Sequence, residues 1–127
     1  MPIINVVDDD ESIRFMLRLF LEREGYDVVE AKSGEECLEK FDHLKPDLIL
    51  LDITMAGIDG WEVCRQIKER RPNILIPISM LSARKTKEDI KRSIEYAHAD
   101  AHIKKPIDRK ELLYTVRILL EKSPMGT

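Results

Sequence analysis

Cysteine is scarce in this chain. Only Cys37 and Cys64 occur among the 127 residues, and neither belongs to a CxxC pair or to a Cys/His cluster. This spacing argues against a disulfide-stapled fold and against a cysteine-based metal site. Because both fall at core-like helical positions, we expect them to serve as small buried hydrophobic residues.

The sequence also lacks long hydrophobic runs and a large excess of either charge. No apolar stretch approaches the length that spans a bilayer, and Met1-Pro2 leads straight into a predicted strand instead of a signal peptide. Lys and Arg total 21 against 24 Asp and Glu, which gives a formal net charge of -3. Nothing in this balance requires nucleic acid or a membrane as a partner, and we expect the protein in the cytoplasm.

A chain of 127 residues is expected to form a single domain with a substantial core. All the predicted strands and helices lie within residues 1–122. Residues 123–127 form a polar tail that we expect to fray. The length leaves no room for a catalytic domain beside a separate effector domain.

Apolar runs and helical stripes alternate along the chain. Five short apolar runs, each followed by a stripe with helical periodicity, predict five strands and five helices. This alternation is typical of a three-layer α/β fold with a parallel sheet covered on both faces. Periodicity does not determine the strand order. The doubly wound order 2-1-3-4-5 would place the first and third strands side by side.

Local signals predict where helices begin and which side chains they bury. Asp10 is well placed to cap the first helix. Trp61 is expected to pack at the start of its helix and not to act as a stacking platform. In the fourth predicted helix, Ile90, Ile94 and Ala97 form a thin apolar stripe that we expect to face the core.

Acidic residues collect at the ends of two predicted strands. Asp8 and Asp9 follow the first strand, and Asp52 ends the buried run of the third. If those strands are neighbours, the three carboxylates meet in the crevice where open parallel sheets bind ligands. At about 5 Å and an effective dielectric near 20, each like-charged pair costs roughly 3 kcal/mol, so the pocket needs a cation. Oxygen ligands alone favour Mg²⁺ over zinc.

Two further strand ends add polar groups. The fourth predicted strand delivers the hydroxyl of Ser82, and the fifth delivers the ammonium of Lys105. Acids, a metal ion, a hydroxyl and a lysine together are typical of a site that holds a phosphoryl group. Gly57 and Gly60, in the loop after Asp52, predict a tight path where something approaches the backbone closely.

At these residues the chain resembles the receiver domain of two-component response regulators, such as the chemotaxis regulators. The similarity extends from Ile3 to about Glu121 and implies a flavodoxin-like (βα)5 fold. Each marker is weak alone, but their order and spacing together are specific. The markers are Asp8 and Asp9, Asp52, residues 55–60, Ser82 and Ala83, and Lys105 and Pro106.

The resemblance implies how a phosphoryl group would be transferred. Asp52 would be the phosphorylation site, taking the group from the phosphohistidine of a histidine kinase or a phosphotransfer protein. Asp9, Asp52 and the backbone carbonyl of Thr54 would ligate Mg²⁺, and Asp8 would act through a metal-bound water. Lys105 would pair with a phosphoryl oxygen.

The resemblance also implies how the signal would be read. Ser82 would hydrogen-bond the phosphoryl group and move inward, which would switch partner binding at the surface of the fourth helix, fifth strand and fifth helix. Thr54 and Arg84 would tune hydrolysis of the phosphoryl group. Nucleic acid binding by this domain is not expected, and the downstream effector is not identified.

Three positions depart from the family pattern. Ala56 stands where proline is common, and His98 occupies a helix end usually held by glycine, where we expect a positive φ. His102 replaces the customary aromatic residue that moves with Ser82. We hypothesise that His102 still acts as a switch, through a pH-dependent polar contact.

Two other readings remain open from the residues. A small Mg²⁺-dependent phosphatase of the haloacid-dehalogenase type also places a nucleophilic aspartate after an apolar strand, but it usually has a second acid two residues later, where this chain has Thr54. A degenerate receiver that serves only as an interaction module would bind no Mg²⁺. As a receiver, the chain would be an enzyme only in catalysing its own phosphorylation and dephosphorylation.

Overall fold

The computed structural model describes residues 1–70, 76–83 and 86–122, in which five strands alternate with five helices. The strands are β1 (Ile3–Val7), β2 (Asp27–Ala31), β3 (Leu48–Asp52), β4 (Ile78–Ser82) and β5 (Ala101–Lys104). The helices are α1 (Glu11–Arg23), α2 (Gly34–Leu44), α3 (Gly60–Arg70), α4 (Lys87–Glu95) and α5 (Arg109–Lys122). No helix within the described ranges has the length and apolar content needed to cross a membrane. The predicted alternation is confirmed.

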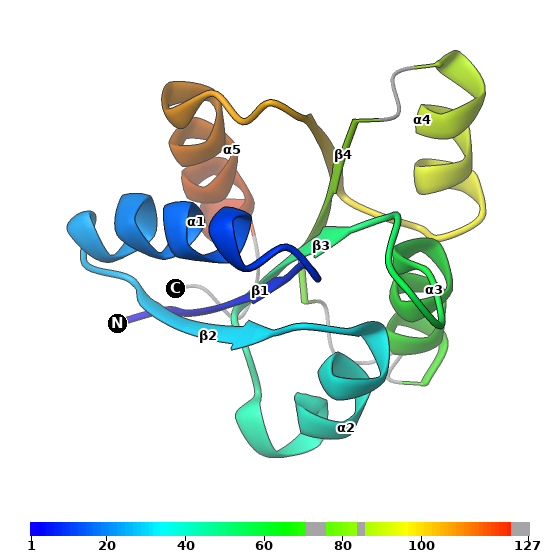
Figure 1. Ribbon diagram of the computed structural model, residues 1–127, viewed down its shortest axis with the longest axis horizontal. Coiled ribbons are helices and arrows are strands. Elements are labelled where there is room, and N and C mark those ends of the chain that lie inside the picture. The colour runs from blue at the N-terminus through cyan, green and yellow to red at the C-terminus, as the bar shows by residue number, and fades with distance from the viewer. Residues whose placement is uncertain (71–75, 84–85, 123–127) are drawn as a thin grey trace.

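The strands form one parallel sheet in the order β2-β1-β3-β4-β5 (Figure 1). This is the doubly wound order considered above, so the predicted three-layer, flavodoxin-like fold is confirmed. β1 and β3 are neighbours in the sheet, and Val7 pairs with Leu51 near their carboxyl ends. In a sheet of this kind the residues that follow the strands gather along one edge. Asp8 and Asp52 therefore emerge side by side.

Helices cover both faces of the sheet (Figure 1). Leu50 packs in an apolar cluster with α1 and α5, whereas Leu51 packs in a cluster with α2 and α3. Successive residues of a strand point to opposite faces, so the continuous apolar run Leu48–Leu51 is explained by burial on both sides. Cys37 and Cys64, both in the described ranges, are 0% exposed and unbridged, which confirms them as buried hydrophobic residues.

The predicted cap of the first helix is present, and a second cap lies at the start of α2. The Asp10 carboxylate accepts the backbone N–H of Ser12 at 2.9 Å at the start of α1. The Ser33 hydroxyl accepts the backbone N–H of Glu36 at 3.1 Å at the start of α2. His98 has a φ of 61°, the left-handed conformation expected at its position. Histidine is among the residues that tolerate this region of backbone space.

The predicted inward face of α4 is wrong at one position. Ile94 is 54% exposed, and the residue that α4 buries fully is Ser93. Ile90, Ser93 and Ala97 are spaced by three and four residues, so they form the face that meets the sheet, and Ile94 lies beside it. Ser93 is tolerated inside because it accepts a hydrogen bond from the indole N–H of Trp61 at 2.9 Å. Trp61 is 6% exposed, as predicted for a packing residue.

The loop after β3 passes close to the end of that strand. A Cβ atom on Gly60 would lie 2.1 Å from the backbone oxygen of Asp52, so no side chain fits there. The Gly60 N–H donates to the carbonyl of Ile53 at 2.8 Å, and Gly57 has a φ of 81°. The close approach predicted for the two glycines is confirmed. The approaching group is the backbone of Asp52 and Ile53 at Gly60, and the side chain of Glu35 at Gly57.

Candidate functional site

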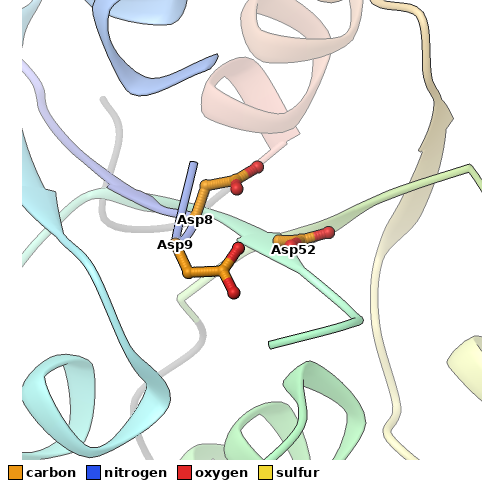
Figure 2. A group of neighbouring side chains, drawn as sticks. All are labelled: Asp8, Asp9 and Asp52. Carbon is orange, nitrogen blue, oxygen red and sulfur yellow. The ribbon is translucent and has the colours of Figure 1, made fainter. Parts of the chain in front are cut away.

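Three carboxylates meet at the carboxyl edge of the sheet (Figure 2). Asp8 and Asp9 follow β1, Asp52 ends β3, and one oxygen from each of the three lies within 4.8 Å of the others. Asp8 is 0% exposed and Asp52 is 5% exposed, whereas Asp9 is exposed. The sheet therefore brings the three predicted acids together and shields two of them from water.

Lys105 closes the acidic pocket from the side of β5. Its ammonium donates to a carboxylate oxygen of Asp8 at 2.8 Å and to one of Asp52 at 3.1 Å. Burial by itself would lower the pKa of Lys105, but the hydrogen bonds and attraction of Asp8 and Asp52 raise it above its usual value. The lysine therefore stays charged and joins the ends of β1 and β3.

The pocket holds more negative charge than Lys105 neutralises. Burial raises the pKa of Asp52 from its ordinary value of 3.8 to about 6, and repulsion from Asp8 and Asp9 acts in the same direction. Lys105 opposes this rise without cancelling it. An ionised Asp52 is thus costly in this pocket, and a bound cation would relieve that cost.

The oxygen atoms of the pocket fit a hard divalent cation. Asp8, Asp9 and Asp52 offer carboxylate oxygens alone, and no histidine or cysteine belongs to the group found in the described residues. Mg²⁺ prefers such ligands and takes one or two carboxylates while keeping several waters. The pKa of Asp52, which burial and repulsion from Asp8 and Asp9 raise, is a second feature that fits a bound cation.

Ser82 lies on the strand next to the one that ends in Asp52, and Thr54 follows Asp52 by two residues. Ser82 ends β4, the strand beside β3, and is 1% exposed. Its carbonyl accepts the backbone N–H of Lys105 at 2.8 Å, which holds Lys105 beside the end of β4. Thr54 is exposed in the loop two residues after Asp52. Arg84, which the resemblance paired with Thr54, lies outside the described residues.

His102 lies in β5 and contacts α4. Its Nδ1 atom is 3.0 Å from the hydroxyl of Ser93, and that hydroxyl also accepts the indole N–H of Trp61 at 2.9 Å. The sequence predicted a polar contact for His102 but did not identify its partner. Hydrogen bonds through Ser93 therefore connect α3, α4 and β5.

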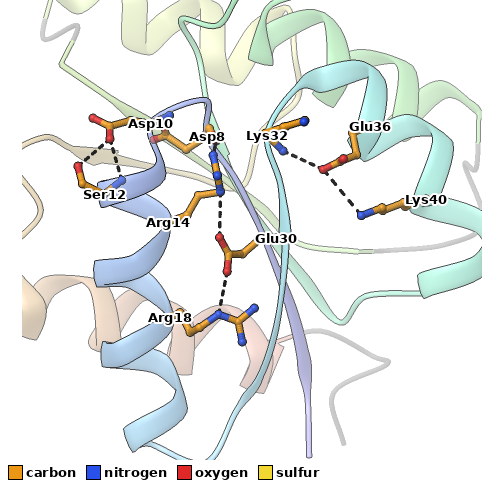
Figure 3. A network of polar contacts seen from close by, with 9 residues as sticks. All are labelled: Asp8, Asp10, Ser12, Arg14, Arg18, Glu30, Lys32, Glu36 and Lys40. Carbon is orange, nitrogen blue, oxygen red and sulfur yellow. Dashed lines mark hydrogen bonds and ion pairs between the residues drawn. The ribbon is translucent and has the colours of Figure 1, made fainter.

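Asp8 is fixed by a residue that the sequence analysis missed. The guanidinium of Arg14, in α1, donates to the backbone oxygen of Asp8 at 2.6 Å (Figure 3). Arg14 also donates to Glu30 of β2 at 2.9 Å, and Arg18 donates to the other oxygen of Glu30 at 2.8 Å. Partial burial raises the pKa of Glu30, but these two arginines bring it below its usual value, so Glu30 stays ionised.

No motif in the sequence singles out Arg14 or Ser93. An arginine one helical turn after the cap at Asp10 would have been a hint, because that spacing points a long side chain back toward the strand end. Ser93 had a weaker signal, a small polar residue three positions after Ile90 on the predicted inward face. Both contacts join segments that only the fold brings together.

Comparison with known proteins finds the same family that the sequence motifs resemble. The family model described as "Response regulator receiver domain" matches residues 4–117. The chain is 42% identical over 123 residues to the alkaline phosphatase synthesis transcriptional regulatory protein PhoP of Bacillus subtilis, covering 97% of this chain and 50% of PhoP. It is also 42% identical to the transcriptional regulatory protein ResD of the same organism, covering 94% of this chain and 48% of ResD. The chain thus spans about half the length of these two relatives.

Solved structures with a similar fold include a chemotaxis protein and a receiver domain. The Vibrio cholerae chemotaxis protein CheY4 superposes with a TM-score of 0.87 at 29% identity, over 94% of this chain and 98% of that one. The BeF3-activated N-terminal receiver domain of Klebsiella pneumoniae RstA superposes with a TM-score of 0.85 at 30% identity, over 94% of this chain and 99% of that one. The likeness therefore extends over nearly the whole chain.

Proposed function

The chain belongs to the response regulator receiver domain family of two-component signalling, and from this membership we propose that Asp52 is its phosphorylation site. Signalling in the family is based on phosphorylation, so the domain needs a nucleophile that accepts a phosphoryl group. The observation that carries the proposal is the meeting of Asp8, Asp9 and Asp52 with the ammonium of Lys105 at one edge of the sheet.

In the proposed reaction, Asp52 attacks the phosphorus of a phosphohistidine. A carboxylate oxygen of Asp52 forms the new O–P bond while the N–P bond breaks, and the imidazole nitrogen leaves with the electron pair and takes up a proton. With a pKa of about 6, Asp52 is mostly ionised at neutral pH and therefore able to attack. The product is an aspartyl phosphate.

Mg²⁺ is the proposed cofactor. Asp9, Asp52 and the backbone carbonyl of Thr54 would hold it, with Asp8 acting through water. When bound, Mg²⁺ would supply positive charge that favours ionised Asp52 and the phosphoryl oxygens. The all-oxygen ligand set and the raised pKa of Asp52 support this assignment.

The remaining site residues would bind the phosphoryl group and set its rate of hydrolysis. Lys105 would pair with one phosphoryl oxygen, and Ser82 would hydrogen-bond another. Thr54 and Arg84 would set how fast the phosphoryl group is hydrolysed. The burial of Ser82 and its place on the strand beside Asp52 support its part in this arrangement.

The proposed output is a change in the surface formed by α4, β5 and α5, with Ser82 and His102 as switch residues. The Ser93 contact gives His102 a route to α4. The proposed phosphoryl donor is a sensor histidine kinase or phosphotransfer protein, and the proposed compartment is the cytoplasm. Residues 1–122 would form the receiver, and residues 123–127, for which the sequence predicts a polar tail, lie outside the described residues. Replacing His102 with Phe should change partner affinity and its pH dependence, and an unchanged binding profile would remove His102 from the switch.

Intact mass after incubation with acetyl phosphate and Mg²⁺ tests the site. The wild type should gain one phosphoryl group, and Asp52→Asn should gain none. Asp10→Asn is the matched control, because it changes a neighbouring acid while asparagine still caps α1. It should be phosphorylated like the wild type. An adduct on Asp52→Asn, or none on the wild type, contradicts the proposal. Turnover of small phosphate esters, which a phosphatase requires, is not expected.

A further inference from the structure

The three acids of the pocket are held in place by different means. Asp8 accepts the Lys105 ammonium at 2.8 Å and the backbone N–H of Asp10 at 2.9 Å, and Asp52 accepts Lys105 at 3.1 Å. Within the described part of the chain, the Asp9 carboxylate makes no hydrogen bond and no ion pair, and the residue is exposed. The direction of the Asp9 side chain is therefore set by its backbone.

The backbone leading into Asp9 is fixed from both sides. The Asp8 N–H donates to the carbonyl of Ala31 in β2 at 3.1 Å. The Asp8 carbonyl, which belongs to the peptide unit that includes the Asp9 nitrogen, accepts Arg14 at 2.6 Å (Figure 3). Because a peptide unit is planar, holding this carbonyl also fixes the orientation of the Asp9 nitrogen. Arg14 is in turn held by Glu30 at 2.9 Å.

We propose that Arg14 is a positioning residue for the metal pocket, acting through the Asp8 carbonyl on the direction of Asp9. This inference rests on the proposed function, because it assigns Arg14 a part in holding Asp9 ready for Mg²⁺. The side chain of Arg14 is 13% exposed, and its guanidinium contacts the acidic loop and β2 at once. Residues that orient metal ligands typically change metal affinity by about 10-fold or more when they are replaced.

Positioning and simple electrostatics predict opposite results at Arg14. The guanidinium is positive and lies next to a pocket proposed to bind a cation. If its charge mattered most, removing it would strengthen Mg²⁺ binding, because a repulsive charge would be gone. If positioning matters most, removing it weakens Mg²⁺ binding, because Asp9 loses its preset direction.

Arg18 provides a matched control on the same helix. It also donates to Glu30, at 2.8 Å, and its removal takes the same charge from α1. Its partners are Glu30 of β2 and Glu22 of α1, and within the described residues it makes no hydrogen bond to Asp8. Arg14→Ala and Arg18→Ala therefore differ in the contact that the inference concerns.

The test is the Mg²⁺ dissociation constant of the wild type, Arg14→Ala and Arg18→Ala, measured by titration calorimetry at one pH and ionic strength. We expect Arg14→Ala to bind Mg²⁺ about 10-fold more weakly and Arg18→Ala to stay within about 2-fold of the wild type. In the metal-free protein, the NMR amide signal of Asp9 should shift in Arg14→Ala and stay near its wild-type position in Arg18→Ala.

The possible failures are distinguishable. Equal or tighter Mg²⁺ binding by Arg14→Ala overturns the positioning role and leaves the proposed function intact. A wild type that binds no Mg²⁺ overturns the proposed function and this inference with it. Thermal unfolding checks that each variant is folded. Arg14→Gln, which keeps more of the side-chain volume, replaces Arg14→Ala if the alanine variant does not fold.

Discussion

Helices α1 and α4 flank the same sheet but are attached to it in different ways. α1 fully buries Leu17 and Leu21 in the apolar cluster that it shares with α5. α4, all of whose residues are described, buries Ser93 and leaves Ile94 54% exposed. Apolar burial holds α1 in addition to the contacts of Arg14 and Arg18 with Asp8 and Glu30, whereas polar and aromatic contacts hold α4. Contacts of the second kind contribute about 1 kcal/mol each and can be exchanged for water, so α4 is the easier helix to reposition.

The attachment of α4 to α3 shows this clearly. The guanidinium of Arg92 lies 4.9 Å from the ring centre of Trp61 and 4.4 Å from that of Tyr96. The Tyr96 hydroxyl donates to Glu62 of α3 at 2.9 Å. Ser93 joins Trp61 and His102 by hydrogen bonds. A helix that carries a proposed output surface is thus fastened by side chains that can change partners without opening a core.

Removing a buried apolar side chain of α1 should have the largest effect on stability. Leu17→Ala deletes a side chain that is 0% exposed and leaves a cavity between α1 and the sheet. We expect the free energy of unfolding to fall by about 4 kcal/mol. Urea unfolding followed by circular dichroism measures it. A loss below about 1 kcal/mol would mean that α1 is not held by burial.

A substitution of Asp52, at the end of β3, should increase the free energy of unfolding, whereas Leu17→Ala lowers it. Asp52 has an ordinary pKa of 3.8, raised to about 6 in the fold. The folded protein therefore binds the proton more tightly, and its stability falls as pH rises from about 4 to 6. Asp52→Asn removes this cost and should stabilise the metal-free protein by up to about 3 kcal/mol at pH 7.

The pH dependence of that gain provides its control. The difference in unfolding free energy between Asp52→Asn and the wild type should shrink as the pH falls from about 6 to 4 and vanish near about pH 3, where the wild-type carboxyl is protonated in both the folded and the unfolded state. Urea unfolding in EDTA at several pH values measures it. A difference that does not change with pH would show that burial and repulsion do not act on Asp52 as described.

Removing the polar contacts of α4 should lower the free energy of unfolding less than removing a buried leucine of α1. Ser93→Ala removes the hydroxyl that Trp61 and His102 contact at 2.9 and 3.0 Å. We expect a loss of about 1 to 2 kcal/mol, because the indole N–H loses this buried acceptor. Amide hydrogen exchange should speed up in α4 while α1 keeps its protection. Equal acceleration in both helices would contradict the difference between them.

The sequence predicts the structure correctly where local chemistry decides it. The apolar run Leu48–Leu51 favours a buried strand, which places Asp52 at its end. The sequence does not predict the structure where a distant partner decides it. Ser93 faces inward because Trp61 and His102 meet it, and those partners are 32 and 9 residues away in the chain. Arg14 contacts the Asp8 carbonyl because α1 returns along the sheet, which no periodicity reveals.

The smallest effect is expected at Ile94, where the sequence predicted burial. Ile94→Ser replaces a side chain that is 54% exposed, so the free energy of unfolding should change by less than about 0.5 kcal/mol. The same change at a buried position such as Leu17 would cost several kcal/mol. Urea unfolding under the conditions used for Leu17→Ala measures it. A loss of more than about 1.5 kcal/mol in the free energy of unfolding would place Ile94 in the core. α4 would then be held by apolar burial, as α1 is.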